Sequence, residues 1–177
     1  QPAVDEHVGG RIGRLHLHTP EGIALSARPE GFQFLNQEAA FFHDRISYYR
    51  FDGIEERPDE VQALADALAP EHHTLILRNH GVAVAGRTVQ GAFMRLHYLL
   101  ICARAQLLAS AAPTPPDEIP EAICAFTRKQ FEAQEARSHF VHEMAARRRR
   151  IDRVWPGYAA EAGRRAPARR APSKASP

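Results

Sequence analysis

The sequence has few cysteines and no long apolar run. Only Cys102 and Cys124 occur among 177 residues, which is too few for a disulfide framework and favours a reduced, cytoplasmic protein. The longest apolar candidate, residues 98–112, is interrupted by Arg104 and Gln106 and falls short of the ~20 residues that a membrane-spanning helix needs. Residues 1–10 lack the apolar core of a secretory signal. We therefore expect no membrane partner.

Long stretches of one charge sign are also missing, except at the C-terminus. Residues 163–177 carry five basic side chains and no acid, and their proline content predicts a disordered tail. The remainder of the chain is mildly acidic. An arginine-rich tail is compatible with nucleic-acid binding, but no aromatic residues lie between these arginines to stack on bases. The pattern therefore favours a solvated tail and disfavours a nucleic-acid partner.

The composition that remains is that of an ordinary globular protein, 44% apolar and 25% charged. Hydrophobic periodicity predicts short strands that alternate with helices, followed by a helical end. We expect strands at 14–18, 46–49, 74–77 and 82–85, and helices at 20–27, 36–45, 58–68, 88–111 and 121–150. Prolines at 113–120 form a linker before the last helix. This order of elements indicates a mixed α/β domain.

Three histidines could carry chemistry. His16 and His18 are separated by one residue on a predicted strand, so their side chains point to the same face. His80 lies in a tight turn between two apolar strands, where we expect Gly81 to adopt a positive φ and reverse the chain. A His-x-His pair alone is more often incidental than functional, and a turn histidine can simply bond the local backbone. Three histidines together would form a zinc site with an open position for water or substrate.

Several separated motifs resemble the class II aldolase/adducin head domain. They keep the family's order and spacing from about residue 8 to residue 158. The motifs are His16-Leu17-His18, Phe34-Leu35-Asn36-Gln37-Glu38-Ala39, Ile46-Ser47-Tyr48-Tyr49, Leu75-Ile76-Leu77-Arg78-Asn79-His80-Gly81 and Gly86-Arg87-Thr88-Val89. The segment from Met144 to Tyr158 is similar to the C-terminal part of bacterial stand-alone members.

This resemblance implies a three-layer α/β/α sandwich with a mostly antiparallel central sheet. It also implies a divalent ion, most often zinc, held by His16, His18 and His80. The implied activity is a metal-dependent carbon–carbon lyase, which acts on a small sugar phosphate or a hydroxy or keto acid through a metal-stabilised enediolate. The implied assembly is a homo-oligomer, a tetramer in many members.

The N-terminal part departs from the family. The family's catalytic glutamate lies further upstream of the His-x-His pair than this sequence extends, so we expect it before Gln1. Neither Glu6 nor Glu21 can be assigned that role. We expect an incomplete aldolase/adducin-like domain at 1–112, a helical extension at 113–162 and the tail at 163–177. Activity in this chain is expected to be impaired. The alternative is an inactive assembly module, for which the adducin head domain is the family's precedent.

Overall fold

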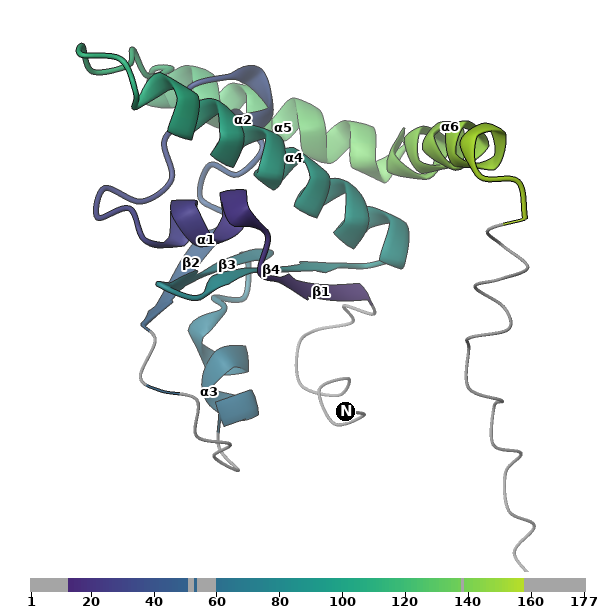
Figure 1. The fold of residues 1–177 in the computed structure, drawn as a ribbon, viewed down its shortest axis with the longest axis horizontal. Helices are drawn as coiled ribbons and strands as arrows, with labels where there is room; N and C mark the ends of the chain where they lie inside the picture. The colour runs from purple at the N-terminus through teal and green to yellow at the C-terminus, as the bar shows by residue number, and fades with distance from the viewer. Residues whose placement is uncertain (1–12, 51–52, 54–59, 138, 158–177) are drawn as a thin grey trace, which may run out of the picture. The chain divides into compact units, whose positions relative to one another are not determined.

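The computed structural model describes residues 13–50, 53, 60–137 and 139–157 (Figure 1). These residues belong to two compact units, one ending at Val141 and the other beginning at His142. The first unit contains the sheet and most of the helices. The second contains most of α6 (His139–Val154). Residues 163–177, the expected disordered tail, lie outside the described residues.

The first unit is built on a four-stranded mixed sheet. Its order is β1-β4-β3-β2, where β1 pairs antiparallel with β4, β4 antiparallel with β3, and β3 parallel with β2. All four strands overlap the segments that the sequence predicts, because apolar alternation between turn residues is a local signal. The bounds are Gly13–Leu17 for β1, Ile46–Arg50 for β2, Thr74–Arg78 for β3 and Gly81–Gly86 for β4.

The register of the strands gives the sheet two different faces. Leu17 pairs with Val82, which pairs with Ile76, and this row packs into the main core. One residue earlier on β1, His16 pairs with Ala83 and belongs to the opposite face. The histidine pair is therefore kept out of the core by strand alternation alone.

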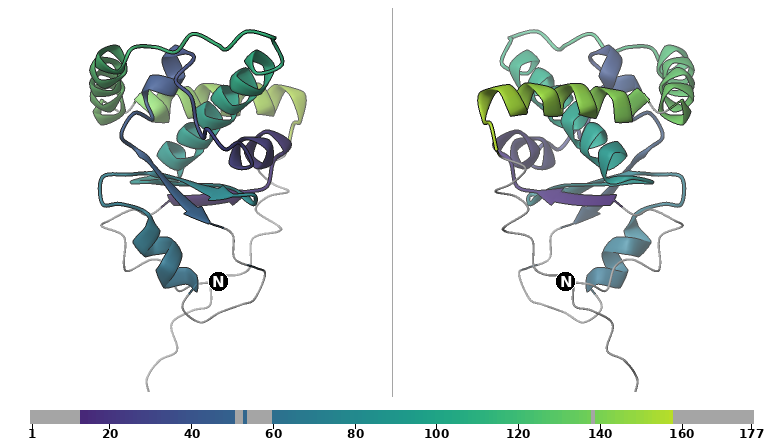
Figure 2. Two further views of the ribbon diagram at one scale, coloured as in Figure 1. Left: turned by 90° about the vertical axis from the view of Figure 1, so that its left-hand side faces the viewer. Right: turned by 90° about the vertical axis from the view of Figure 1, so that its right-hand side faces the viewer.

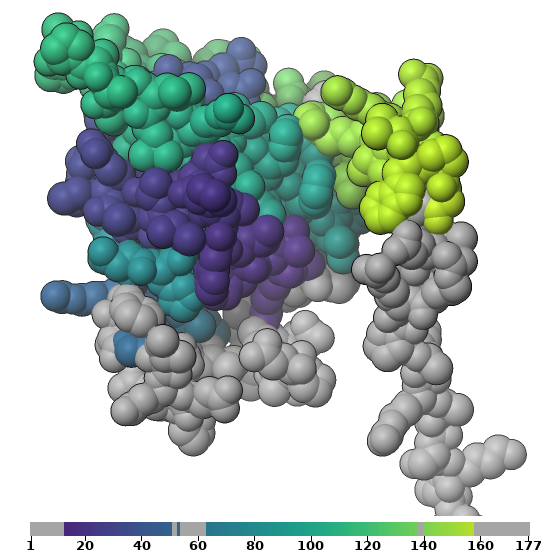
Figure 3. Space-filling model, viewed as in Figure 1, coloured from purple at the N-terminus to yellow at the C-terminus, as the bar shows by residue number. Residues whose placement is uncertain are grey.

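Helices cover both faces of the sheet. Helices α1 (Pro20–Ser26) and α4 (Val89–Ala109) lie on one face and pack against each other, while α3 (Glu60–Ala67) lies on the other (Figures 1 and 2). In the space-filling view, the atoms of α1 and α4 lie directly side by side (Figure 3). Thr19 and Thr88 cap α1 and α4, because each hydroxyl accepts a bond from a backbone N–H three residues on. None of the helices in the described part of the chain has the length and apolar character needed to cross a bilayer.

A cluster of aromatic rings connects the helices to one another. Phe41 is fully buried, and its ring centroid lies 5.3 Å from that of Phe131, 5.7 Å from that of Phe140 and 6.4 Å from that of Tyr98. Helix α2 (Gln37–Ala40) is capped by Asn36, whose side chain accepts a bond from the Ala39 backbone N–H, and it ends five residues before the predicted end. The chain leaves the helix at Phe41 through tight turns, which direct consecutive aromatic rings into the core.

The predicted helix over 121–150 is two helices, α5 (Glu121–Ala136) and α6. Phe131 and Phe140 are nine residues apart, so at ~100° per residue they would face opposite sides of one continuous helix. Both nevertheless contact Phe41 and Tyr98. The break after Ala136 allows both rings to enter the same cluster, and tertiary packing overrides the helical propensity of the segment.

A buried arginine connects α4, α5 and the sheet. Arg95 is 8% exposed, and its Nη1 donates to the Ala85 carbonyl oxygen at 2.6 Å. Its Nη2 donates to both carboxylate oxygens of Glu135 on α5, each at 2.6 Å. Because a buried guanidinium is costly without such partners, this pairing favours one orientation of α5 against α4.

We predict that Phe41→Ala lowers the free energy of unfolding by about 3–5 kcal/mol, because it removes a buried ring and leaves a cavity between four elements. Phe126→Ala, on the exposed side of α5 where that ring is 62% exposed, is the matched control and should change stability by less than ~1 kcal/mol. Urea denaturation followed by circular dichroism measures both. Equal losses for the two variants would show that the cluster is not the centre of the core.

Candidate metal centre

Strand β1 and the turn after β3 approach one another at one end of the sheet. The antiparallel register pairs His16 with Ala83 and Leu17 with Val82. Continued by one residue, this register places His18 beside Gly81, the first residue of β4. His80 directly precedes Gly81, so pairing of the backbones brings the two histidine segments together.

A hydrogen-bonded turn holds His80. Its backbone N–H donates to the Leu77 carbonyl oxygen at 3.0 Å. Asn79, in the middle of the turn, has a φ of 59°, a left-handed conformation that asparagine tolerates better than most residues. Its backbone N–H donates to the Ser26 carbonyl oxygen at 3.2 Å, which attaches the turn to α1.

The three imidazoles converge, as the sequence leads us to expect. Their ring centroids lie 4.7 Å apart for His16 and His18, 5.1 Å for His16 and His80, and 4.6 Å for His18 and His80. The Nε2 atoms of His16 and His18 are 3.1 Å apart. One nitrogen from each ring lies within 4.8 Å of the other two, and in the described part of the chain no other group of three His, Cys, Asp or Glu side chains has this arrangement.

The surroundings of His16 favour its neutral ring. Partial burial lowers the pKa of His16 from its ordinary value, and the positive charges that His18 and His80 would carry lower it further. A neutral imidazole keeps a lone pair available at near-neutral pH, and this is the form that binds a metal ion. A neutral His16 ring beside the nitrogens of His18 and His80 therefore suits a shared cation.

Gly81 has a different role from the one expected. It does not have a positive φ, because the left-handed residue of this turn is Asn79. A Cβ at Gly81 would instead lie 2.7 Å from the Leu17 carbonyl oxygen and 2.9 Å from Cδ2 of His18. The absence of a side chain lets β1 and the His18 ring approach β4 closely. Sequence reasoning missed this role because the contact joins segments about sixty residues apart.

The nearby acids have separate positions. Glu21 lies in the first turn of α1, on the helical side of the sheet, whereas His16 belongs to the opposite face. Glu6 lies outside the described residues. Neither acid is placed beside the three rings by the described structure.

The fold and the ordered motifs define the class of protein. Residues 13–107 match the Class II Aldolase and Adducin N-terminal domain, and the chain belongs to that family. The structure of an aldolase II superfamily protein from Pseudomonas syringae superposes with a TM-score of 0.73 and 29% identity, covering 80% of this chain and 57% of that chain. The L-fuculose 1-phosphate aldolase from Glaciozyma antarctica PI12 gives a TM-score of 0.56 and 28% identity, covering 66% of this chain and 43% of that chain.

Two relatives found by sequence are named for different roles, one as a decarboxylase and one as an adducin. The decarboxylase NovR of Streptomyces niveus is 35% identical over 118 residues, which are 66% of this chain and 43% of NovR. Mouse alpha-adducin is 33% identical over 105 residues, which are 59% of this chain and 14% of the adducin. The chain therefore spans less than half the length of either protein.

We predict that Gly81→Ala weakens binding of Co²⁺ by at least about tenfold, the lower end of the loss that follows when a ligand's support is removed. The added methyl group displaces the His18 ring or the end of β1. Gly157→Asn is the control, because a Cβ there meets nothing within 4 Å and asparagine tolerates the positive φ of 87° at this position. Titration by visible absorption measures affinity, and circular dichroism verifies folding. Unchanged Co²⁺ affinity in a folded Gly81→Ala protein would contradict the close-approach role.

Proposed function

We propose that this chain is the metal-binding part of a class II aldolase-type carbon–carbon lyase. The single observation that carries the proposal is the convergence of His16, His18 and His80 in a member of the aldolase/adducin family. A purely structural role for the domain needs no such cluster on the side of the sheet that faces away from the main core.

The donor set of three imidazole nitrogens fits a divalent ion such as zinc. Two nitrogens bound at ~2.0–2.1 Å in a tetrahedral site lie about 3.3 Å apart. The 3.1 Å separation of the His16 and His18 Nε2 atoms is close to this value. The third ring needs a modest adjustment, since the three ligand atoms lie within 4.8 Å of one another. His16, His18 and His80 would hold the ion.

The chemistry of the site follows from its three-ligand character. A divalent ion held there would supply Lewis acidity for a substrate carbonyl and the neighbouring hydroxyl oxygen. The chain's own contribution is to orient three neutral imidazoles and to leave one side of the cluster open, since His16 and His18 are exposed. Cleavage also needs a positioned base, and we propose that a glutamate upstream of Gln1 supplies it.

The substrate class follows from the relatives. One structural relative is named as an aldolase of L-fuculose 1-phosphate, and one sequence relative is named as a decarboxylase. We propose a small sugar phosphate or a hydroxy or keto acid, with a substrate carbonyl next to a hydroxyl or a carboxylate. We propose that residues 1–177 alone turn over substrate poorly, because Glu21 lies on the other side of the sheet from His16.

The proposal includes the wider organisation of the protein. Further strands upstream would complete a three-layer sandwich around a mostly antiparallel sheet. We also propose domain limits of 1–112, 113–162 and 163–177 and a cytoplasmic homo-oligomer, a tetramer by the family resemblance. These proposals are based on membership of the aldolase/adducin family and not on contacts between the described residues.

A second candidate is an inactive assembly module. The similarity to mouse alpha-adducin, 33% identity over 105 residues, favours it. The two candidates make different demands on the histidines. A lyase needs a metal at this cluster, whereas an assembly module has no use for one, so metal binding discriminates between them.

We predict that the chain binds one Zn²⁺ or Co²⁺ ion and that His80→Ala weakens this binding by at least about tenfold, because it removes one of three ligands. His142→Ala is the matched control, since this exposed histidine lies in the second unit and outside the cluster. Isothermal titration calorimetry gives the stoichiometry and the affinity. Equal metal affinity in the two variants would exclude the cluster as the site.

We predict little or no turnover from this chain, even with zinc or manganese bound, because a positioned base contributes ~10²–10⁴-fold. The assay measures retro-aldol and decarboxylase activity on phosphorylated sugars and hydroxy acids. Turnover in the ordinary range of ~1–10³ s⁻¹ that His80→Ala abolishes would show that a residue within the chain acts as the base. Activity that appears only in a longer chain carrying upstream residues would favour the lyase over the assembly module.

A further inference from the structure

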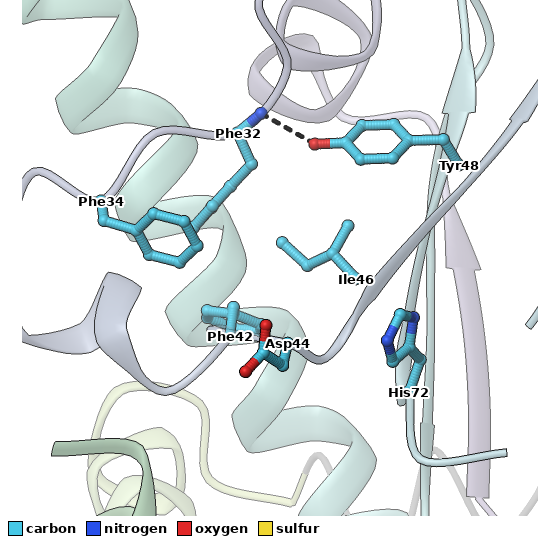
Figure 4. Close-up of a pocket in the computed structure, with 7 residues that line it drawn as sticks. All are labelled: Phe32, Phe34, Phe42, Asp44, Ile46, Tyr48 and His72. Atoms are coloured by element: carbon cyan, nitrogen blue, oxygen red, sulfur yellow. Dashed lines mark hydrogen bonds between the residues drawn. The ribbon is translucent and has the colours of Figure 1, made fainter. Parts of the chain in front are cut away.

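A second concave site lies at the other edge of the sheet, beside β2. It is a pocket of about 280 Å³ (Figure 4). Tyr48 on β2 lies in the row that faces the core helices, not the face of His16. The sheet order puts β2 and β1 at opposite edges. The pocket is therefore separate from the histidine cluster. Its lining residues are Phe32, Phe34, Phe42, Asp44, Ile46, Tyr48 and His72.

Aromatic and aliphatic groups make the walls. Phe32 and Phe42 are buried and pack edge to face, with centroids 5.5 Å apart, and Phe34 packs on Phe32 at 5.6 Å. Tyr48 is held in place because its hydroxyl accepts a bond from the Phe32 backbone N–H at 3.0 Å, which Figure 4 shows. The walls are therefore pre-formed by packing and by this bond, which lowers the entropy cost of binding an apolar group.

A carboxylate lies at the mouth of this apolar pocket. The Asp44 side chain is 65% exposed, and one of its oxygens lies 3.1 Å from Nδ1 of His43. Asp44 has a φ of 54°, in the left-handed region, and Arg45 donates from Nη1 to the Asp44 carbonyl oxygen at 2.7 Å. Aspartate tolerates this conformation, and the contact with Arg45 fixes the backbone from which the carboxylate projects.

The charge of the lining selects for a cation. Asp44 is the one acidic residue among the lining residues, and none of them is a lysine or an arginine. His72 is the one histidine among the lining residues, and its Nδ1 lies 2.8 Å from the Ser47 hydroxyl oxygen. The Arg78 guanidinium carbon lies 4.4 Å from the Tyr48 ring centroid, so a cation of the chain already covers one face of this ring and Asp44 is the lining group left for a ligand cation.

We propose that this pocket binds an alkylammonium group, with the alkyl part against the phenylalanine rings and the ammonium beside Asp44. Aromatic walls and one carboxylate are the combination that recognises organic cations. The small volume limits the ligand to a short amine or to the end of a lysine side chain. These two sources share one chemistry, and the experiment separates them.

The test uses three probes on the full chain: n-butylammonium, its neutral counterpart n-butanol, and Nα-acetyl-lysine N-methylamide. Amide chemical-shift titration by NMR measures the affinity and reports whether Phe32 and Asp44 respond. We expect both amines to bind at least fivefold more tightly than butanol. Tighter binding of the lysine derivative would assign the pocket to a protein side chain, whereas equal binding would assign it to free amines, and either result supports the inference.

Asp44→Asn should weaken binding of both amines at least fivefold and leave butanol binding unchanged. Asparagine tolerates a positive φ as well as aspartate does, so this variant is expected to fold. Asp117→Asn is the matched control, since it removes an exposed carboxylate that does not line the pocket. Equal affinity for butanol and the amines, or an Asp44→Asn protein that binds amines as tightly as the original, would overturn the inference.

Discussion

The antiparallel pairing of β1 with β4 is the constraint on which the candidate metal centre depends. Two of the three histidines lie on or directly after β1, and the third directly precedes β4. Each backbone hydrogen bond between these strands therefore also positions an imidazole. A shift of one residue would turn His16 into the core and Leu17 out of it, so burial of the leucine row and exposure of the histidines enforce the same register.

Helices α1 and α4 pack directly on one face of this sheet, and Phe41 joins the helices to one another. Phe41 contacts rings from α4, α5 and the start of α6, and Arg95 adds a directional link between α4 and α5. The apolar contacts supply most of the favourable free energy, and the buried ion pair adds orientation more than stability. Both types of contact lie on the side of α1 and α4, whereas His16 belongs to the opposite face of the sheet.

The two candidate sites differ in how their polar groups are supported. The histidine cluster depends on strand register and on the missing Cβ of Gly81. The pocket beside β2 depends on tertiary packing of Phe32 and Phe42 and on the unusual backbone of Asp44. They occupy opposite edges and opposite faces of one sheet, so ligands at the two sites would not compete for the same side chains.

Local chemistry in the sequence determined the strands, the caps at Thr19, Asn36 and Thr88, and the pairing of His16 with His18 on one face. These features depend on residues within a few positions of one another, and apolar periodicity reports them directly. Tertiary structure decided where α2 ends, why α5 and α6 are separate, and why residue 81 is glycine. In each case the cause is a contact between distant segments: rings converging on Phe41, or β1 approaching β4. A single sequence does not display such contacts, because backbone and side-chain packing choose them only once the chain is folded.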